Sequence, residues 1–138
     1  MNYTDSLKPF VLISASRAAW SAEANADSTR QLASQLLARD FEIAQVRGSY
    51  GGTEEDSFLV LCDPQTEHYR FDMLKQLAKR YGQESILVVD AERSALLRFM
   101  DERVSAEPLP GKFQAVDSVT AHKLHGWTRR EGQYYAVL

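Results

Sequence analysis

The stretch Phe10-Val-Leu-Ile13 is a run of apolar residues that decides how the chain folds. Two further runs, Phe58-Leu-Val-Leu61 and Ile86-Leu-Val-Val89, share its character. All three are short, rich in branched and aromatic side chains, and bounded by polar or turn residues, which is typical of buried strands. A fourth segment, Phe41 to Val46, alternates apolar and polar residues, which predicts a strand with one wetter face.

Two segments between these strands carry apolar residues at helical spacing. The first, from Trp20 to Leu37, predicts a helix that ends near Ala38, and the second, from Phe71 to Tyr81, predicts a helix that Gly82 terminates. The candidate caps are Asn25, Asp27 or Ser28 for the first helix and Thr66 for the second. The order strand, helix, strand, strand, helix, strand predicts a ferredoxin-like α/β sandwich.

The remainder of the chain predicts a β extension of this sandwich. Its expected strands are Ala95 to Met100, Lys112 to Val116, and a terminal hairpin of Trp127 to Arg130 and Gln133 to Val137 around Glu131-Gly132. With 138 residues in all, we expect residues 1–138 to form a single domain.

The three fully apolar runs indicate that both faces of the sheet are covered. An antiparallel sheet with one wet face shows alternation, and these runs show none. Either the C-terminal extension covers the second face, or identical subunits pack sheet against sheet in a closed ring. We expect a ring, with the extension helping.

Composition excludes several classes of function. The 16 Lys and Arg against 19 Asp and Glu give a net charge of −3, which argues against nucleic acid as a partner. No stretch approaches the roughly 20 apolar residues that cross a bilayer, and Phe10 to Ile13 is too short for a secretory signal, so we expect a cytoplasmic protein and no membrane partner. One cysteine and three scattered histidines give no metal-ligand set.

The segment Arg47-Gly-Ser-Tyr-Gly-Gly-Thr-Glu-Glu-Asp56 joins the second and third strands and combines three glycines with a tyrosine and three acids. Glycines let the backbone approach a ligand closely, although no Gly-Lys-Ser/Thr follows as in a phosphate-binding loop. The segment is either a flexible hairpin tip with solvated acids or a ligand loop.

Weaker candidates surround the first strand and helix. Ser14-Ala-Ser-Arg17 leaves the first strand where α/β folds often bind ligands, or it is a plain polar connection. Glu23 and Asn25 are either ligand contacts or an ordinary solvated helix face. Cys62 ends an apolar strand, where a buried inert thiol is expected.

Taken together, these segments resemble the phage-encoded S-adenosylmethionine-degrading enzymes, once called hydrolases and better described as lyases. The resemblance rests on FVLISASR (Phe10 to Arg17), the helix around Glu23 and Asn25, TEEDSFLVLC (Thr53 to Cys62), SILVV (Ser85 to Val89), LPGKFQAV (Leu109 to Val116) and the closing Tyr135-Ala-Val. It spans most of the chain, and its specific pieces are TEE before a strand that ends in Cys, and LPG-x-FQ-x-V.

The resemblance implies a homotrimer of α/β sandwiches similar to the PII (GlnB-like) signalling proteins, with active sites at subunit interfaces. It also implies cleavage of S-adenosylmethionine to 5′-methylthioadenosine and L-homoserine lactone without a cofactor. Such a reaction is a phage counter-defence, because it depletes the methyl donor that restriction and modification systems use.

Cyclisation explains why so few catalytic groups are visible. If the substrate's own carboxylate attacks the carbon that bears the sulfonium, no protein nucleophile, base or metal is needed. We expect Glu55, ahead of Glu54, to be the catalytic carboxylate and Tyr50 to orient the reacting arm. Ser14 and Arg17 are candidates for adenosine or interface contacts, and Glu23 and Asn25 are further candidates for substrate binding.

Two other functions stay open. The first is a non-enzymatic PII-like trimer whose loop from Tyr50 to Asp56 moves on binding an adenine nucleotide. Phosphates favour Lys or Arg around such a loop, and the segment from Arg47 to Asp56 has only Arg47. The second is an adaptor that acts by surface contact, for which a net charge of −3 is too weak to mimic DNA.

Overall fold

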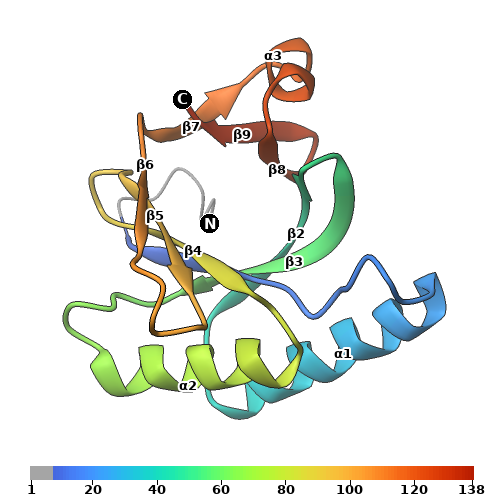
Figure 1. Cartoon of the computed structure of the whole chain (residues 1–138), viewed down its shortest axis with the longest axis vertical. Helices are drawn as coiled ribbons and strands as arrows, with labels where there is room; N and C mark the ends of the chain where they lie inside the picture. The colour runs from blue at the N-terminus through green and yellow to red at the C-terminus, as the bar shows by residue number, and fades with distance from the viewer. Residues whose placement is uncertain (1–7) are drawn as a thin grey trace.

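One curled antiparallel sheet organises the chain, and a computed structural model describes it over residues 8–138 (Figure 1). Within that range the sheet has nine strands in the order β6-β5-β4-β1-β3-β2-β8-β9-β7. The strands are β1 (Phe10–Ile13), β2 (Ile43–Tyr50), β3 (Thr53–Leu61), β4 (Ser85–Val89), β5 (Ala95–Phe99), β6 (Glu107–Leu109), β7 (Phe113–Val116), β8 (Gly126–Arg130) and β9 (Gln133–Val137). The expected strands are thus confirmed, with β6 added and β2 longer than the sequence indicated.

The helices are α1 (Ala22–Ala38), α2 (His68–Arg80) and α3 (Ser118–Lys123). Helix α1 ends where the sequence predicted, but the predicted caps Asn25, Asp27 and Ser28 are wrong. The N-cap is Ser21, whose side chain accepts a hydrogen bond from the main-chain N–H of Ala24 at 3.1 Å. Helix α2 has no side-chain cap, so Thr66 was also wrong as a cap, whereas Gly82 does follow the helix with a φ of 72°. Over residues 8–138, no helix is both long enough and apolar enough to span a membrane.

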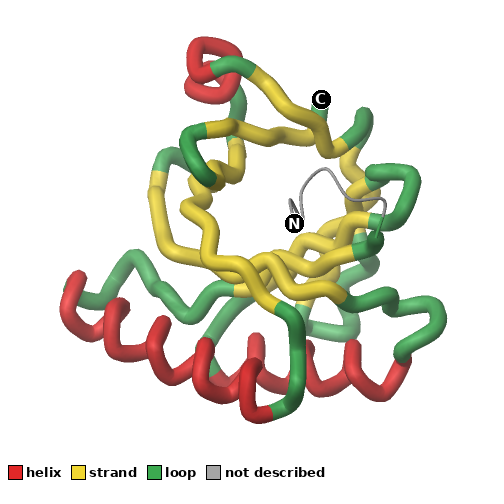
Figure 2. Tube along the Cα trace, turned by 180° about the vertical axis from the view of Figure 1, so that it is seen from behind, coloured by secondary structure: helices red, strands yellow, loops and turns green. Residues whose placement is uncertain are grey.

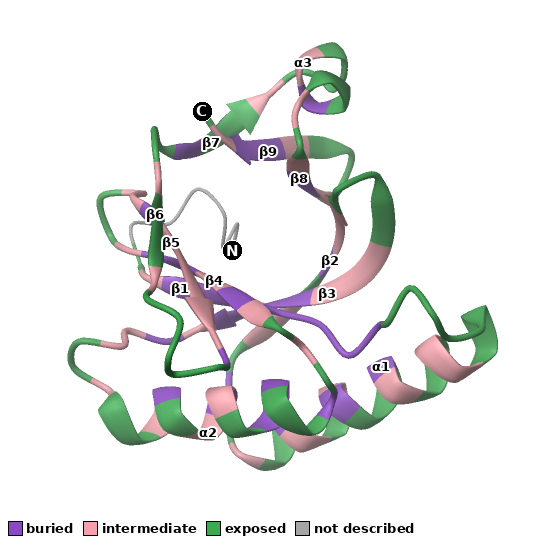
Figure 3. Ribbon diagram, in the orientation of Figure 1, coloured by how far each residue is buried: buried purple, intermediate pink, exposed green. Residues whose placement is uncertain are grey.

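Helices α1 and α2 lie side by side against one face of the sheet, which we call the helix face (Figures 1 and 2). Alternate side chains of the central strands enter a core beneath them, including Val11, Phe58 and Val60. From α1 and α2, Leu36 and Leu74 meet these strands, and both are fully buried. Figure 3 shows the buried positions concentrated where the helices meet the sheet.

The opposite face of the sheet, here the inner face, is covered by the chain's own C-terminal strands. The sheet curls round on itself (Figure 2). Strand β7 thereby approaches the turn after β4, where the N–H of Phe113 donates to the carbonyl of Arg93 at 2.8 Å. The ring of Phe113 packs edge-on against Phe10 at 5.2 Å and stacks on Tyr135 at 5.7 Å. One chain therefore buries both faces of its central strands, so their apolar character is no argument for a ring of subunits.

The segment from Arg47 to Asp56 is not a long loop, which corrects the prediction. Strands β2 and β3 pair residue by residue up to Tyr50 and Thr53, and only Gly51 and Gly52 form the turn. Both glycines have positive φ, 62° and 86°, as a two-residue hairpin turn demands. The acids of this segment therefore lie on a strand, where successive side chains point to opposite faces.

Candidate active site

A cavity of about 630 Å³ opens on the inner face, where the curled sheet surrounds it. It is lined by β1, β2 and β3 on one side, β4 to β6 on another, and β7 to β9 on the third. Its apolar and aromatic lining includes Leu12, Leu87, Leu97, Leu109, Phe113, Trp127 and Tyr135. Its size and lining are those of a small-molecule site.

The ionisable lining of the cavity is acidic. Glu55, Glu84 and Glu107 contribute carboxylates, His125 contributes an imidazole, and no Lys or Arg of the described residues lines it. A site with carboxylates, aromatic faces and no fixed cation favours a positively charged ligand over a phosphate. This argues against the nucleotide-binding alternative, as does the short hairpin turn.

Glu55 occupies the inner face of β3 because of the strand register. It lies opposite Gly48 of β2, and the neighbouring pairs on the same face are Val46 with Ser57 and Ala44 with Leu59. Burial raises the pKa of the Glu55 carboxyl, and this effect outweighs the lowering by the Ser14 hydroxyl and the Arg47 charge. Glu55 is thus a partly desolvated carboxylate, and a cationic ligand would stabilise its ionised form.

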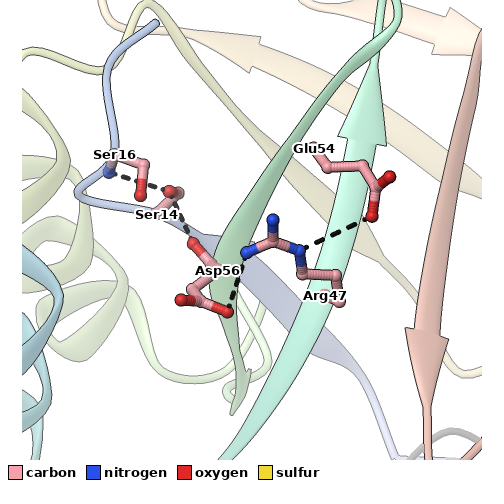
Figure 4. Close-up of polar contacts among 5 residues, drawn as sticks. All are labelled: Ser14, Ser16, Arg47, Glu54 and Asp56. Carbon is pink, nitrogen blue, oxygen red and sulfur yellow. Dashed lines mark hydrogen bonds and ion pairs between the residues drawn. The ribbon is translucent and has the colours of Figure 1, made fainter. Parts of the chain in front are cut away.

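Ser14 ties the end of β1 to Asp56 of β3, the residue that follows Glu55 (Figure 4). Its hydroxyl donates to the main-chain oxygen of Asp56 at 2.9 Å and accepts from the N–H of Ser16 at 3.0 Å. Ser14 is only 4% exposed and lines the cavity. It therefore fixes the backbone that carries Glu55.

Tyr50 lies at the rim of the cavity, at the end of the β2–β3 hairpin. Its ring packs edge-on against His125 at 4.5 Å and lies over Gly126, where a Cβ would come within 3.3 Å of the ring. Although Tyr50 lines the cavity, its side chain is 64% exposed. The aromatic wall at this point is half open to solvent.

Glu54 points to the other side of the hairpin from Glu55. Its carboxylate lies 3.6 Å from Nε of Arg47, whose Nη1 contacts the Asp56 carboxylate at 3.2 Å (Figure 4). Glu54 does not line the cavity. The structure therefore brings Glu55, Tyr50 and Ser14 to one site and leaves Glu54 outside it.

The remaining candidates lie away from the cavity lining. The side-chain amide of Asn25 makes two hydrogen bonds to the backbone of Arg17, each 2.9 Å long, which holds the connection after β1 against α1. The Arg17 guanidinium lies 5.3 Å above the Trp20 ring. Glu23 is exposed in the first turn of α1, where its negative charge interacts favourably with the positive end of the helix dipole.

Sequence reasoning missed several lining residues. Glu84, Glu107 and His125 belong to no recognisable sequence motif. They line the cavity because the sheet curls and brings distant segments together. Phe113 lies in the LPG-x-FQ-x-V segment, which was the available signal. Trp127 and Tyr135 were predicted only as residues of the terminal hairpin, with Tyr135 also in the closing Tyr135-Ala-Val of the resemblance. They do pack there, and they line the cavity as well.

Two further expectations concern cysteine and metal ligands. Cys62 is 2% exposed and burial raises the pKa of its thiol to about 11, which confirms a buried, protonated thiol. Over residues 8–138, no three His, Cys, Asp or Glu side chains gather closely enough to hold a metal ion.

The fold and the cavity together define an α/β protein with an inner cavity whose acidic and aromatic lining suits a small cationic ligand. The sequence profile of the S-adenosylmethionine lyase family matches residues 11–138, and the chain belongs to this family. It is therefore an enzyme that acts on S-adenosylmethionine, an aromatic nucleoside joined to a sulfonium. Among proteins of curated function, none matches the chain with statistical significance.

Proposed function

We propose that the protein cleaves S-adenosylmethionine in the inner-face cavity by intramolecular cyclisation. The substrate carboxylate attacks the carbon that bears the sulfonium, and a new C–O bond forms as the C–S bond breaks. The bonding electron pair goes to sulfur, which leaves as the neutral thioether of 5′-methylthioadenosine. The other product is L-homoserine lactone, which keeps the ammonium charge.

The observation that supports this proposal is the acidic, partly apolar lining of the cavity. The reaction merges a carboxylate and a sulfonium into uncharged groups, so water stabilises the reactant charges more than the transition state. A cavity whose wall includes Leu12, Leu87 and Phe113 removes part of that water. The cavity also holds the methionine arm in a conformation that brings its carboxylate close to the carbon bearing the sulfonium. This positioning lowers the entropic part of the barrier to cyclisation.

We assign Glu55 the binding of the substrate ammonium group. A carboxylate next to the sulfonium would stabilise a charge that disappears in the reaction, and this would raise the barrier. The ammonium keeps its charge throughout, so a carboxylate can hold it without that cost. Tyr50 provides the aromatic wall for the sulfonium arm, and Ser14 positions Glu55. Glu54 acts indirectly, since with Asp56 it neutralises Arg47 on the opposite side of the strand. Asn25 and Arg17 order the connection after β1, and Glu23 remains a candidate for contact with substrate only through a neighbouring subunit.

We further propose that residues 1–138 act as one lyase domain of ferredoxin-like, PII-type topology. The support is the antiparallel neighbourhood β4-β1-β3-β2 together with the order strand, helix, strand, strand, helix, strand. A homotrimer with sites at subunit interfaces rests on the family resemblance, and the exposed rim at Tyr50 is where a second subunit would complete the site. Light scattering at micromolar concentration tests it, and a strictly monomeric mass rejects it.

The biological setting that we propose is phage counter-defence in the host cytoplasm. Degradation of the methyl donor there deprives restriction and modification systems of their substrate. The support is the resemblance to phage-encoded enzymes, and a host strain whose S-adenosylmethionine pool is unchanged on expression would reject it.

Product analysis tests the chemistry. Purified protein is incubated with S-adenosylmethionine in H₂¹⁸O without added metal, and products are followed by proton NMR and mass spectrometry from the earliest time point. Cyclisation gives lactone before homoserine, and the fresh lactone carries no solvent oxygen. Direct hydrolysis instead places the label in the homoserine hydroxyl, and that result overturns the cyclisation mechanism.

A further inference from the structure

A second concave site lies on the helix face, between α2 and β5. Its volume is about 300 Å³, and we call it the basic cleft. The lining residues are Lys75, Lys79, Arg98, Phe99, Met100, Glu102, Val104, Ser105 and Ala106. Because successive residues of β5 point to opposite faces, Leu97 lines the inner-face cavity while Arg98 lines the basic cleft. The two sites are separated by the sheet.

Cations from two elements converge on this cleft. Nζ of Lys75 lies 5.4 Å from the centroid of the Phe71 ring, and Cζ of Arg98 lies 5.5 Å from the same centroid. Lys79 follows Lys75 by one helical turn on α2, so it projects from the same side of the helix. Glu102 supplies the one carboxylate of the lining, so the cleft holds three positive charges and one negative charge. This local excess occurs in a chain whose net charge is −3.

The positive charges are only partly neutralised within the protein. Lys75 contacts the Asp72 carboxylate at 3.2 Å, and its side chain is 21% exposed. Among residues 8–138, Lys79 and Arg98 form no ion pair. Like charges held near one aromatic ring repel each other, and an external anion relieves that repulsion. Ser105 adds a hydroxyl donor to the same lining.

We propose that the basic cleft binds a phosphate group, either as inorganic phosphate or as part of a phosphate ester. With Asp72 beside Lys75 counted as well as Glu102, the cleft keeps an excess of one positive charge, which favours an anionic group. Arg98 offers the planar fork of donors that suits phosphate oxygens, and Lys75 and Lys79 offer point charges around it. The site is independent of the proposed lyase reaction, whose cavity has no Lys or Arg among its described lining residues.

Titration of the full-length protein with inorganic phosphate at constant ionic strength, followed by amide NMR shifts, tests this site. We expect saturable binding with the largest shifts in residues 98–106. Arg98→Gln and Lys79→Gln each weaken it about tenfold or more, because each removes a charge-assisted contact. Lys123→Gln removes one positive charge from α3, remote from the cleft, and is expected to bind as the unsubstituted protein does.

A parallel titration with adenosine triphosphate, without metal, separates the two sources of phosphate. Binding of both probes indicates a site for the phosphate group itself. Binding of the nucleotide alone indicates a site for a phosphate ester. Either result supports the proposal if the binding is weakened in Arg98→Gln or Lys79→Gln. The absence of saturable binding by either probe overturns it. An equal loss in Lys123→Gln also overturns it, since binding then reflects overall charge. If Arg98→Gln does not fold, the exposed Lys79 provides the test alone.

Discussion

The hydroxyl of Ser14 donates to the main-chain oxygen of Asp56 across 2.9 Å, which ties the end of β1 to the residue that follows Glu55. The bond spans 42 positions of sequence and is buried on the Ser14 side. It places the carboxylate of Glu55 at a fixed depth in the cavity. The position of the candidate catalytic group thus depends on a hydrogen bond that a buried serine makes.

Ser14→Ala is therefore expected to weaken both stability and function. Loss of the hydroxyl leaves the Asp56 carbonyl and the Ser16 N–H without this partner, which costs about 1 to 3 kcal/mol of unfolding free energy. Urea denaturation measures the change. Ser34→Ala, at an exposed position of α1, serves as the control and is expected to stay within about 0.5 kcal/mol. Equal effects of the two substitutions contradict a structural role for the Ser14 hydroxyl.

Glu55→Gln keeps the size of the side chain and removes its charge. Because Glu55 holds the ammonium group and so orients the substrate carboxylate for attack, its loss misaligns the reacting atoms, and turnover is expected to fall by roughly 10² or more. Glu54→Gln is a matched control on the adjacent residue, and its carboxylate faces Arg47 rather than the cavity. We expect it to retain most of the activity. Formation of 5′-methylthioadenosine by chromatography gives both rates, and unchanged turnover in both variants rules out the assignment.

The raised pKa of Glu55 also predicts a pH dependence of stability. Burial makes the folded state bind this proton more tightly than the unfolded state does, so the stability linked to Glu55 is greatest at low pH. That contribution is lost as the pH rises through the folded-state pKa. Gln resembles the protonated form, so Glu55→Gln is expected to melt above the unsubstituted protein at pH 7. The difference narrows as the pH falls below the raised pKa, and calorimetry that finds the opposite trend contradicts the desolvation of Glu55.

Tyr50 tests the aromatic wall. Tyr50→Phe keeps the ring over Gly126 and against His125, so kcat/KM is expected to remain close to that of the unsubstituted protein. Tyr50→Ala removes the ring and is expected to lower kcat/KM roughly tenfold, the scale of one aromatic contact with a cation. Tyr69→Ala changes a tyrosine that is 78% exposed on α2, and no effect is expected. A full loss in Tyr50→Phe assigns the function to the hydroxyl instead.

The sequence predicted the parts of the fold that depend on local pattern. The apolar strands at Phe10, Phe58 and Ile86, the end of α1 at Ala38 and the terminal hairpin are all where periodicity and turn residues placed them. Each of these signals comes from residues that are near one another in the sequence. The order of elements along the chain followed from them.

The hairpin from Arg47 to Asp56 was misjudged because its composition disfavours a strand. Glycines and consecutive acids are depleted in strands, yet here Arg47 pairs across β2 and β3 with Asp56, and Glu54 adds a second charge contact. Cross-strand pairing therefore outweighed intrinsic propensity. The same register sends Glu55 inward and Glu54 outward, a distinction that the sequence could make only once the strand was recognised.

The curl of the sheet could not be predicted, because it depends on contacts between distant segments. Phe113 meets Phe10 from the far end of the chain, and this contact closes the inner-face core. The cavity and its carboxylates Glu84 and Glu107 exist only because of that closure. The composition of the strands indicated that the second face was covered, but not by what.

Phe113→Ala tests whether the C-terminal strands are integral to the fold. The ring is 4% exposed and lies between Phe10 and Tyr135, so its removal is expected to cost about 3 to 5 kcal/mol of unfolding free energy. Val119→Ala, on α3 at 67% exposure, is the control and is expected to change it by no more than about 0.5 kcal/mol. Chemical denaturation followed by circular dichroism measures both. A single cooperative unfolding transition at lower denaturant concentration shows that one chain closes its own core. An unchanged unfolding free energy in Phe113→Ala contradicts this, and the C-terminal strands would then serve only as contacts between subunits.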